Sequence, residues 1–130
     1  MADAADRGSA RPAFAGLVYP VLSLAKSRTH SGSRANLLGP DAPAAKVAAR
    51  DPVQNVTGDT PPCFLVHAID DNTVPVENSL DMIAACRAAK VPVSAHLFES
   101  GGHGFGTRLP QANPGSMWPE LFTRWIGQHV

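Results

Sequence analysis

Two short segments in the second half of the chain carry residues that could move a proton. Residues 67–75 read His-Ala-Ile-Asp-Asp-Asn-Thr-Val-Pro, and residues 101–105 read Gly-Gly-His-Gly-Phe. A carboxylate that accepts a hydrogen bond from one imidazole nitrogen fixes the tautomer of the ring. The other nitrogen can then take a proton from a hydroxyl group and return it to a leaving group. The two segments therefore predict an acid–base pair in which His103 is the base.

The setting of His103 favours a catalytic role. Most isolated histidines in proteins have no catalytic function. Here glycines precede and follow His103, so the backbone can turn sharply and a substrate can approach the ring. Together with the acid upstream, this setting predicts catalysis rather than the capping of a neighbouring element.

Asp71 is the predicted orienting acid, and Asp70 is its rival. Asp71 stands three residues before Val74 in the sequence Asp-Asn-Thr-Val-Pro, the spacing that turns such a loop back toward the sheet. This spacing favours Asp71 and leaves Asp70 as a solvated or capping carboxylate. We expect His67 to be packed, or hydrogen-bonded to the Asp loop, rather than catalytic.

Both segments follow apolar runs that are expected to be buried strands. Three such runs occur, at residues 14–19, 63–68 and 93–98, and each is typical of a strand buried on both faces of a parallel sheet. An acid and then a histidine, each just past the end of a strand, is how a Ser–Asp–His triad presents its last two members.

Helices are expected between and after the strands. Short helices are predicted within residues 31–39 and 41–49, and longer ones over 77–90 and 118–129. Apolar periodicity predicts one face for each longer helix. These faces comprise Leu80, Met82, Ile83, Ala84, Cys86 and Arg87 in the first, and Leu121, Phe122, Trp125 and Ile126 in the second.

This alternation predicts an α/β fold with three parallel strands and flanking helices. We expect a loose N-terminal segment over residues 1–11 and one partial domain over 12–130. Three apolar strands leave an apolar edge uncovered. The chain alone is therefore expected to self-associate through that edge, to dissolve poorly, or to pair with a separate N-terminal half.

Composition excludes several classes of partner. The 130 residues are 44% hydrophobic, and Lys plus Arg and Asp plus Glu number 11 each, so no charge excess favours nucleic acid or a membrane. The N-terminus lacks a signal-peptide pattern; the compartment is unknown, with the cytoplasm favoured. Cys63 and Cys86 are predicted to be buried free thiols. No metal site is expected.

The nucleophile of a triad is missing from the sequence. A Gly-x-Ser-x-Gly elbow does not occur in the 130 residues, and Ser33, Ser79, Ser100 and Ser116 all lack its flanking pattern. A His-Gly-Gly-type loop that could donate oxyanion hydrogen bonds is missing as well. The chain is therefore expected to supply Asp71 and His103 only and to be inactive alone.

Five segments together resemble the C-terminal half of a known group. They are residues 15–20 (Ala-Gly-Leu-Val-Tyr-Pro), 30–39 (His-Ser-Gly-Ser-Arg-Ala-Asn-Leu-Leu-Gly), 61–67 (Pro-Pro-Cys-Phe-Leu-Val-His), 71–79 (Asp-Asn-Thr-Val-Pro-Val-Glu-Asn-Ser) and 101–105. They are similar to α/β-hydrolase esterases of the acetyl esterase, acetyl-xylan esterase and lipase-like kind, in the prolyl oligopeptidase and dienelactone hydrolase superfamily.

The resemblance implies a C-terminal part of an α/β-hydrolase fold, in which Asp71 is the triad acid and His103 the triad base. It implies a serine carboxylic-ester hydrolase that acts on acetyl or short-acyl esters, sugar acetates included, with a small-molecule ester as substrate and no cofactor. The first five strands, the oxyanion loop and the nucleophile elbow of that fold are not in this sequence. Two alternatives stay open: a non-catalytic fragment or partner subunit of a split enzyme, and the C-terminal piece of a prolyl oligopeptidase-type peptidase.

Overall fold

A computed structural model describes residues 11–129, and residues 1–10 of the expected loose segment lie outside the described residues. The described elements are β1 (Ala15–Val18), α2 (Ser31–Leu38), α3 (Ala44–Arg50), β2 (Cys63–Ala68), α4 (Glu77–Ala88), β3 (Val93–Phe98), the short 3₁₀ helix η1 (Pro114–Met117) and α5 (Trp118–Ile126). The predicted strands and helices are thus confirmed: β2 and β3 have the predicted bounds, and the ends of the other elements differ from the predicted ones by no more than three residues. The proposed domain boundary at residue 12 stays a prediction.

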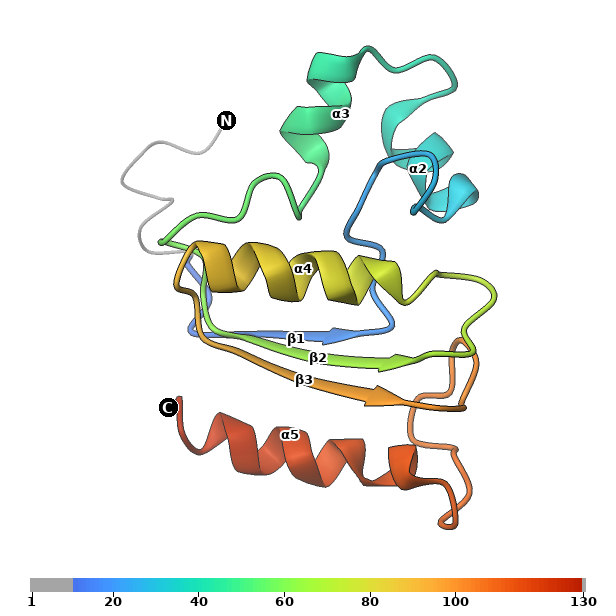
Figure 1. Ribbon diagram of the computed structural model, residues 1–130, viewed down its shortest axis with the longest axis vertical. Coiled ribbons are helices and arrows are strands. Elements are labelled where there is room, and N and C mark those ends of the chain that lie inside the picture. The colour runs from blue at the N-terminus through green and yellow to red at the C-terminus, as the bar shows by residue number, and fades with distance from the viewer. Residues whose placement is uncertain (1–10, 130) are drawn as a thin grey trace.

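The strands form a parallel sheet in the order β1-β2-β3 (Figure 1). The three strands are in register at their amino ends, where Ala15 pairs with Cys63 and Cys63 with Val93. β1 is shorter than the predicted run because Tyr19 has a φ of 38°, outside the extended region, and a proline follows it. The predicted α/β architecture with flanking helices is confirmed.

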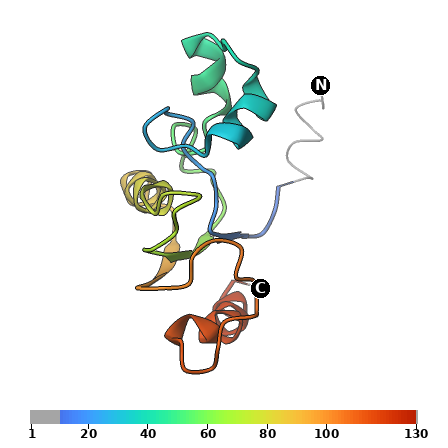
Figure 2. The ribbon, with the colours of Figure 1, turned by 90° about the vertical axis from the view of Figure 1, so that its right-hand side faces the viewer.

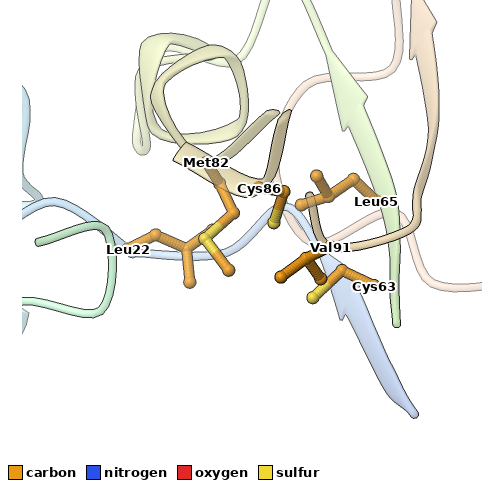
Figure 3. Packing of buried hydrophobic residues seen from close by; sticks show 6 residues of the cluster. All are labelled: Leu22, Cys63, Leu65, Met82, Cys86 and Val91. Carbon is orange, nitrogen blue, oxygen red and sulfur yellow. The ribbon is translucent and has the colours of Figure 1, made fainter. Parts of the chain in front are cut away.

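Helices cover both faces of the sheet. α4 lies on one face and α5 on the other, and α2 and α3 lie beyond α4 on its side of the molecule (Figures 1 and 2). β2 is buried along its whole length, so its side chains alternate between two cores. The core on the α4 face contains Leu22, Cys63, Leu65, Met82, Cys86 and Val91 (Figure 3). The core on the α5 face contains Phe64, Val66, Ala68, Phe105 and Trp125.

The predicted inner face of α4 is partly wrong. Met82 and Cys86 are buried as predicted. Leu80 is 45% exposed, and Ala84 and Arg87 are exposed as well. The other buried residues of this helix are the polar Asn78 and Ser79. The helix is rotated relative to the apolar pattern because Asn78 and Ser79 find buried hydrogen-bond partners. Buried polar groups are tolerated when they are paired in this way.

The other packing predictions are confirmed. In α5, Trp125 is buried, and Leu121, Phe122 and Ile126 pack against the same core. Both cysteines are free and buried. No helix within the described residues combines the length and the apolar character needed to cross a membrane.

One edge of β1 has no strand beside it in the described part of the chain. The N–H groups of Ala15 and Tyr19 donate to carbonyl groups of the β2 segment. Backbone groups alternate in direction along a strand, so those of Gly16 and Val18 point away from β2. This edge could accept a further parallel strand.

Candidate active site

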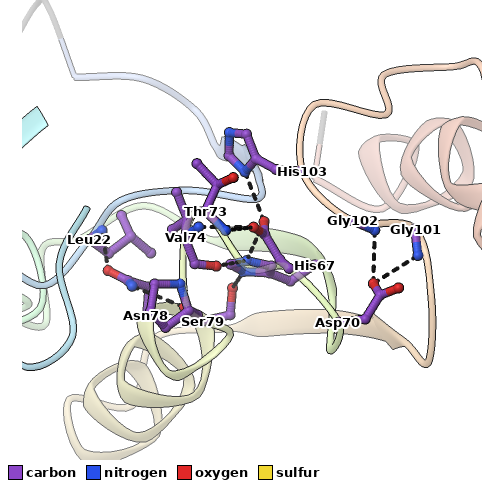
Figure 4. A network of polar contacts seen from close by, with 12 residues as sticks. Leu22, His67, Asp70, Thr73, Val74, Asn78, Ser79, Gly101, Gly102 and His103 are labelled. Carbon is purple, nitrogen blue, oxygen red and sulfur yellow. Dashed lines mark hydrogen bonds and ion pairs between the residues drawn. The ribbon is translucent and has the colours of Figure 1, made fainter. Parts of the chain in front are cut away.

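The loops after β2 and β3 bring Asp71 and His103 into contact. Nδ1 of His103 lies 2.8 Å from Oδ2 of Asp71, although the residues are 32 positions apart (Figure 4). The Asp71 side chain is 0% exposed, whereas that of His103 is 33% exposed. The acid is therefore inside the protein and the imidazole is within reach of a substrate.

Asp71 is held by its own loop. Its Oδ1 accepts hydrogen bonds from the N–H groups of Thr73 and Val74, each at 2.9 Å. Burial raises the pKa of the carboxyl group, but the hydrogen bonds from Val74, His103 and Thr73 and the charge of His103 outweigh burial. The pKa of Asp71 therefore lies below its ordinary value of 3.8. The acid stays ionised at neutral pH and can accept the Nδ1–H of His103.

Asp70 holds the loop that carries His103. Its Oδ1 accepts hydrogen bonds from the N–H groups of Gly101 and Gly102, at 2.9 and 2.8 Å (Figure 4). It caps the loop that carries His103 and does not contact the imidazole ring. Gly102 and Gly104 have φ values of 62° and 71°, in the region that favours glycine. The sequence of this loop is therefore matched to the turn that presents His103.

His67 lies beneath Asp71. It is completely buried, with Nε2 2.9 Å from the carbonyl oxygen of Val74 and 3.2 Å from Oδ2 of Asp71. Its Nδ1 lies 2.8 Å from Oγ of Ser79 on α4. The expectation that His67 is packed against, and hydrogen-bonded to, the Asp loop is confirmed.

Sequence reasoning missed two residues that shape the site. The ring of Tyr19 stands edge-on to the imidazole of His103, with centroids 4.8 Å apart. Asn78 accepts from the N–H groups of Leu22 and Ser23 at 2.9 Å each and donates to the carbonyl groups of Arg28 and Pro75. Asn78 thereby ties the segment after β1 to α4. In the sequence, the dipeptide Tyr19-Pro20 indicated only a turn at the end of β1, and nothing there indicated the contact with His103.

The four serines named in the sequence analysis form hydrogen bonds with groups other than His103 in the described structure. Ser79 bonds to His67, Ser33 to His30, Ser100 to Asn113 and Ser116 to the carbonyl of Gln111. Within residues 11–129, no three His, Cys, Asp or Glu side chains gather in a way that could hold a metal ion. The arrangement of Asp71 and His103 can orient an imidazole and move a proton through its Nε2.

Comparison with known proteins finds relatives of this chain in sequence. A model of the prolyl oligopeptidase family matches residues 22–129. An endo-1,4-beta-xylanase B of Butyrivibrio fibrisolvens is 34% identical over 92% of this chain and 17% of its own length. An acetylxylan esterase of Xylanibacter ruminicola is 36% identical over 74% of this chain and 21% of its own length.

Solved structures show the same fold. An acetyl ester-xyloside bifunctional hydrolase from Caldicellulosiruptor lactoaceticus superposes with a TM-score of 0.85 at 36% identity, covering 91% of this chain and 43% of that protein. The chain therefore has the fold of the corresponding part of an α/β hydrolase. It spans about a fifth of the curated relatives and less than half of this structural neighbour.

Proposed function

The chain belongs to the prolyl oligopeptidase family, and from this premise we propose that it supplies the acid and the base of a serine-type carboxylic-ester hydrolase. The single observation that carries the proposal is the 2.8 Å contact between Oδ2 of Asp71 and Nδ1 of His103. In the proposed role, Asp71 holds the proton of His103 on Nδ1, so that Nε2 carries a free lone pair.

The proposed reaction passes through an acyl-enzyme. Nε2 of His103 takes the proton of a serine hydroxyl as its oxygen attacks the ester carbonyl, and then gives that proton to the departing alcohol oxygen. Nε2 then takes a proton from a water molecule as the water oxygen attacks the acyl-enzyme. The acyl–serine bond breaks, the carboxylic acid leaves, and Nε2 returns the proton to the serine oxygen. The ionised Asp71 stabilises the imidazolium that forms in each step.

The serine would come from outside these 130 residues, on the same polypeptide or on another. The edge of β1 that has no strand beside it among residues 11–129 supports a position for this serine. The carboxyl ends of parallel strands meet at one edge of a sheet, and β1 leads directly to Tyr19, whose ring contacts His103. A strand added beside β1 in the parallel direction would end next to His103, where a nucleophile is required.

The proposed substrates are acetyl or other short-acyl esters, including those on sugars. The names of the relatives support this choice, since they include an acetylxylan esterase and an acetyl ester-xyloside hydrolase. The structural likeness to the latter extends over 91% of this chain.

A hybrid enzyme tests the proposal. Residues 12–130 replace the corresponding part of the Caldicellulosiruptor hydrolase, and hydrolysis of p-nitrophenyl acetate is measured. We expect turnover by the hybrid, and a loss of about 10²–10⁴-fold in kcat when His103→Gln removes the base. A hybrid that turns over equally well with glutamine at position 103 would refute the proposed role.

The chain by itself provides the complementary test. It should hydrolyse p-nitrophenyl acetate no faster than free imidazole does, and a fluorophosphonate probe for activated serines should leave it unlabelled. Turnover above the imidazole rate would show that a serine within these residues acts as the nucleophile.

A further inference from the structure

The hydrogen bonds of His67 fix which of its nitrogens carries the proton. The carbonyl oxygen of Val74 can only accept, so Nε2 of His67, 2.9 Å away, must carry a hydrogen. In the neutral ring, Nδ1 is then an acceptor, and Oγ–H of Ser79 donates to it over 2.8 Å. Because both side chains are completely buried, water cannot replace either partner.

The same Nε2 of His67 also lies close to the proposed catalytic acid. Oδ2 of Asp71 lies 3.2 Å from it and 2.8 Å from Nδ1 of His103. One carboxylate oxygen thus stands between two imidazoles, one fully buried and one partly exposed. The other oxygen, Oδ1, is already occupied by the N–H groups of Thr73 and Val74.

We propose that His67 is a positioning residue for the acid–base pair, an inference that rests on the proposed function of Asp71 and His103. Its Nε2–H fixes the direction in which Oδ2 of Asp71 faces, so that the carboxylate presents a lone pair to Nδ1 of His103. Ser79 keeps His67 in the required tautomer from α4. The chain of contacts Ser79–His67–Asp71–His103 therefore links the first turn of a helix to the reactive imidazole.

A purely structural role makes a different prediction. If His67 only fills space beneath the loop, any side chain of similar size should keep the Asp71–His103 contact. If it acts through its N–H donor, a side chain that keeps a donor near the Nε2 position should preserve the contact. His67→Gln keeps such an N–H, whereas His67→Met has similar bulk and no donor.

Proton NMR of the chain labelled with ¹⁵N-histidine reports the contact directly. The Nδ1–H of His103 should give a protected downfield signal in the wild type and in His67→Gln. In His67→Met it should vanish through exchange with water, and in Ser79→Ala it should broaden. His96→Gln is the matched control, because His96 is a partly buried strand histidine that contacts Phe64 and Ser94 on the opposite face, and it should leave the signal unchanged.

Each outcome decides the matter. An unchanged His103 signal in folded His67→Met would overturn the proposal, and so would its loss in folded His67→Gln. If His67→Met does not fold, His67→Gln and Ser79→Ala still test the proposal. An unchanged His103 signal in Ser79→Ala would show that Ser79 is not needed to fix the tautomer of His67. Because this readout needs no ester hydrolysis, it is independent of whether the proposed function holds.

In the active hybrid, the same variants separate positioning from binding. We expect His67→Met to lower kcat by about 10²-fold with KM nearly unchanged, the size of effect that a small displacement of a catalytic group produces. His67→Gln should recover most of that loss. An effect on KM alone would contradict the proposal.

Discussion

The ring of Tyr19 stands edge-on to the imidazole of His103, at an interplanar angle of 61° and with centroids 4.8 Å apart. The same ring also packs edge-on against Phe105, at 4.9 Å. Tyr19 has a φ of 38°, a conformation that costs energy for any residue with a side chain. The end of β1 is thus held in a strained turn that brings an aromatic ring against His103, the proposed catalytic base.

Replacing Tyr19 tests how much the contacts of this ring stabilise the fold. Tyr19→Phe keeps the ring, and Tyr19→Ala removes it, while both keep a Cβ at the positive φ. We expect Tyr19→Ala to be less stable than Tyr19→Phe by at least about 1 kcal/mol, from the lost aromatic contacts alone. Urea unfolding of both variants measures the difference, and equal midpoints would show that the ring contributes nothing.

Asn78 should be the most sensitive polar residue of α4. Asn78→Ala leaves the N–H groups of Leu22 and Ser23 and the carbonyl of Arg28 without their partner. We expect a loss of about 3 kcal/mol in the free energy of unfolding. Leu80→Ala, at an exposed position of the same helix, is the control and should change it by less than about 0.5 kcal/mol. The opposite ranking would mean that the apolar pattern had located the buried face correctly.

The two cysteines should be unreactive until the chain unfolds. Burial, and to a smaller extent the neighbouring Cys86 thiol, raise the pKa of Cys63 to about 12. Burial also raises the pKa of Cys86. A thiol-specific reagent at pH 8 should therefore label the folded protein slowly and the urea-unfolded protein fast. Fast labelling of the folded protein would contradict the buried positions of both thiols.

The raised pKa of Cys63 predicts a loss of stability at alkaline pH. A pKa that is higher in the folded state than in the unfolded state stabilises the fold below the unfolded value. That stability is lost as the pH rises from the ordinary thiol value of 9.0 toward about 12. Cys63→Ala should flatten this part of the curve of unfolding free energy against pH, and an unchanged curve would argue against the shift.

Acid should weaken the fold in two stages. Burial lowers the pKa of His96 below 6.5, and hydrogen bonding lowers that of Asp71 below 3.8. Each lowered value stabilises the fold above the unfolded pKa, and this stability is lost as the pH falls through the folded one. His96→Gln should therefore remove the stage that begins near 6.5, while Asp71→Asn removes the lower one. Denaturant unfolding at a series of pH values from neutral to acidic measures both stages. A variant that keeps the stage it should remove would contradict the prediction.

Much of the fold was predictable because its signals are local. The segments that form β2 and β3 are apolar and are bounded by prolines, glycines or acidic loops. The ends of both strands could therefore be predicted from the sequence. Asp71 could be preferred over Asp70 because a turn that returns to the sheet fixes the spacing to Val74. The structure adds the reason: Val74 N–H donates to Oδ1 of Asp71.

The rest depended on contacts between residues far apart in the chain. Asn78 bonds to Leu22 across 56 positions, and Asp70 bonds to Gly101 across 31. Apolar periodicity cannot register such polar contacts, and for this reason the buried face of α4 was misplaced. The sequence placed His67 against the Asp loop, but it did not show that Nε2 of His67 lies 3.2 Å from Oδ2 of Asp71.

The central claim is that Asp71, rather than its neighbour, orients His103 for proton transfer. The most direct measurement is kcat for p-nitrophenyl acetate in the hybrid enzyme with Asp71→Asn or Asp70→Asn. Asparagine at position 71 can donate to His103 and so select the wrong tautomer, and we predict a fall of about 10⁴-fold. Asparagine at position 70 keeps the oxygen that accepts from Gly101 and Gly102, so kcat should stay close to that of the unsubstituted hybrid. The reverse ranking, with Asp70→Asn abolishing turnover and Asp71→Asn sparing it, would contradict the account.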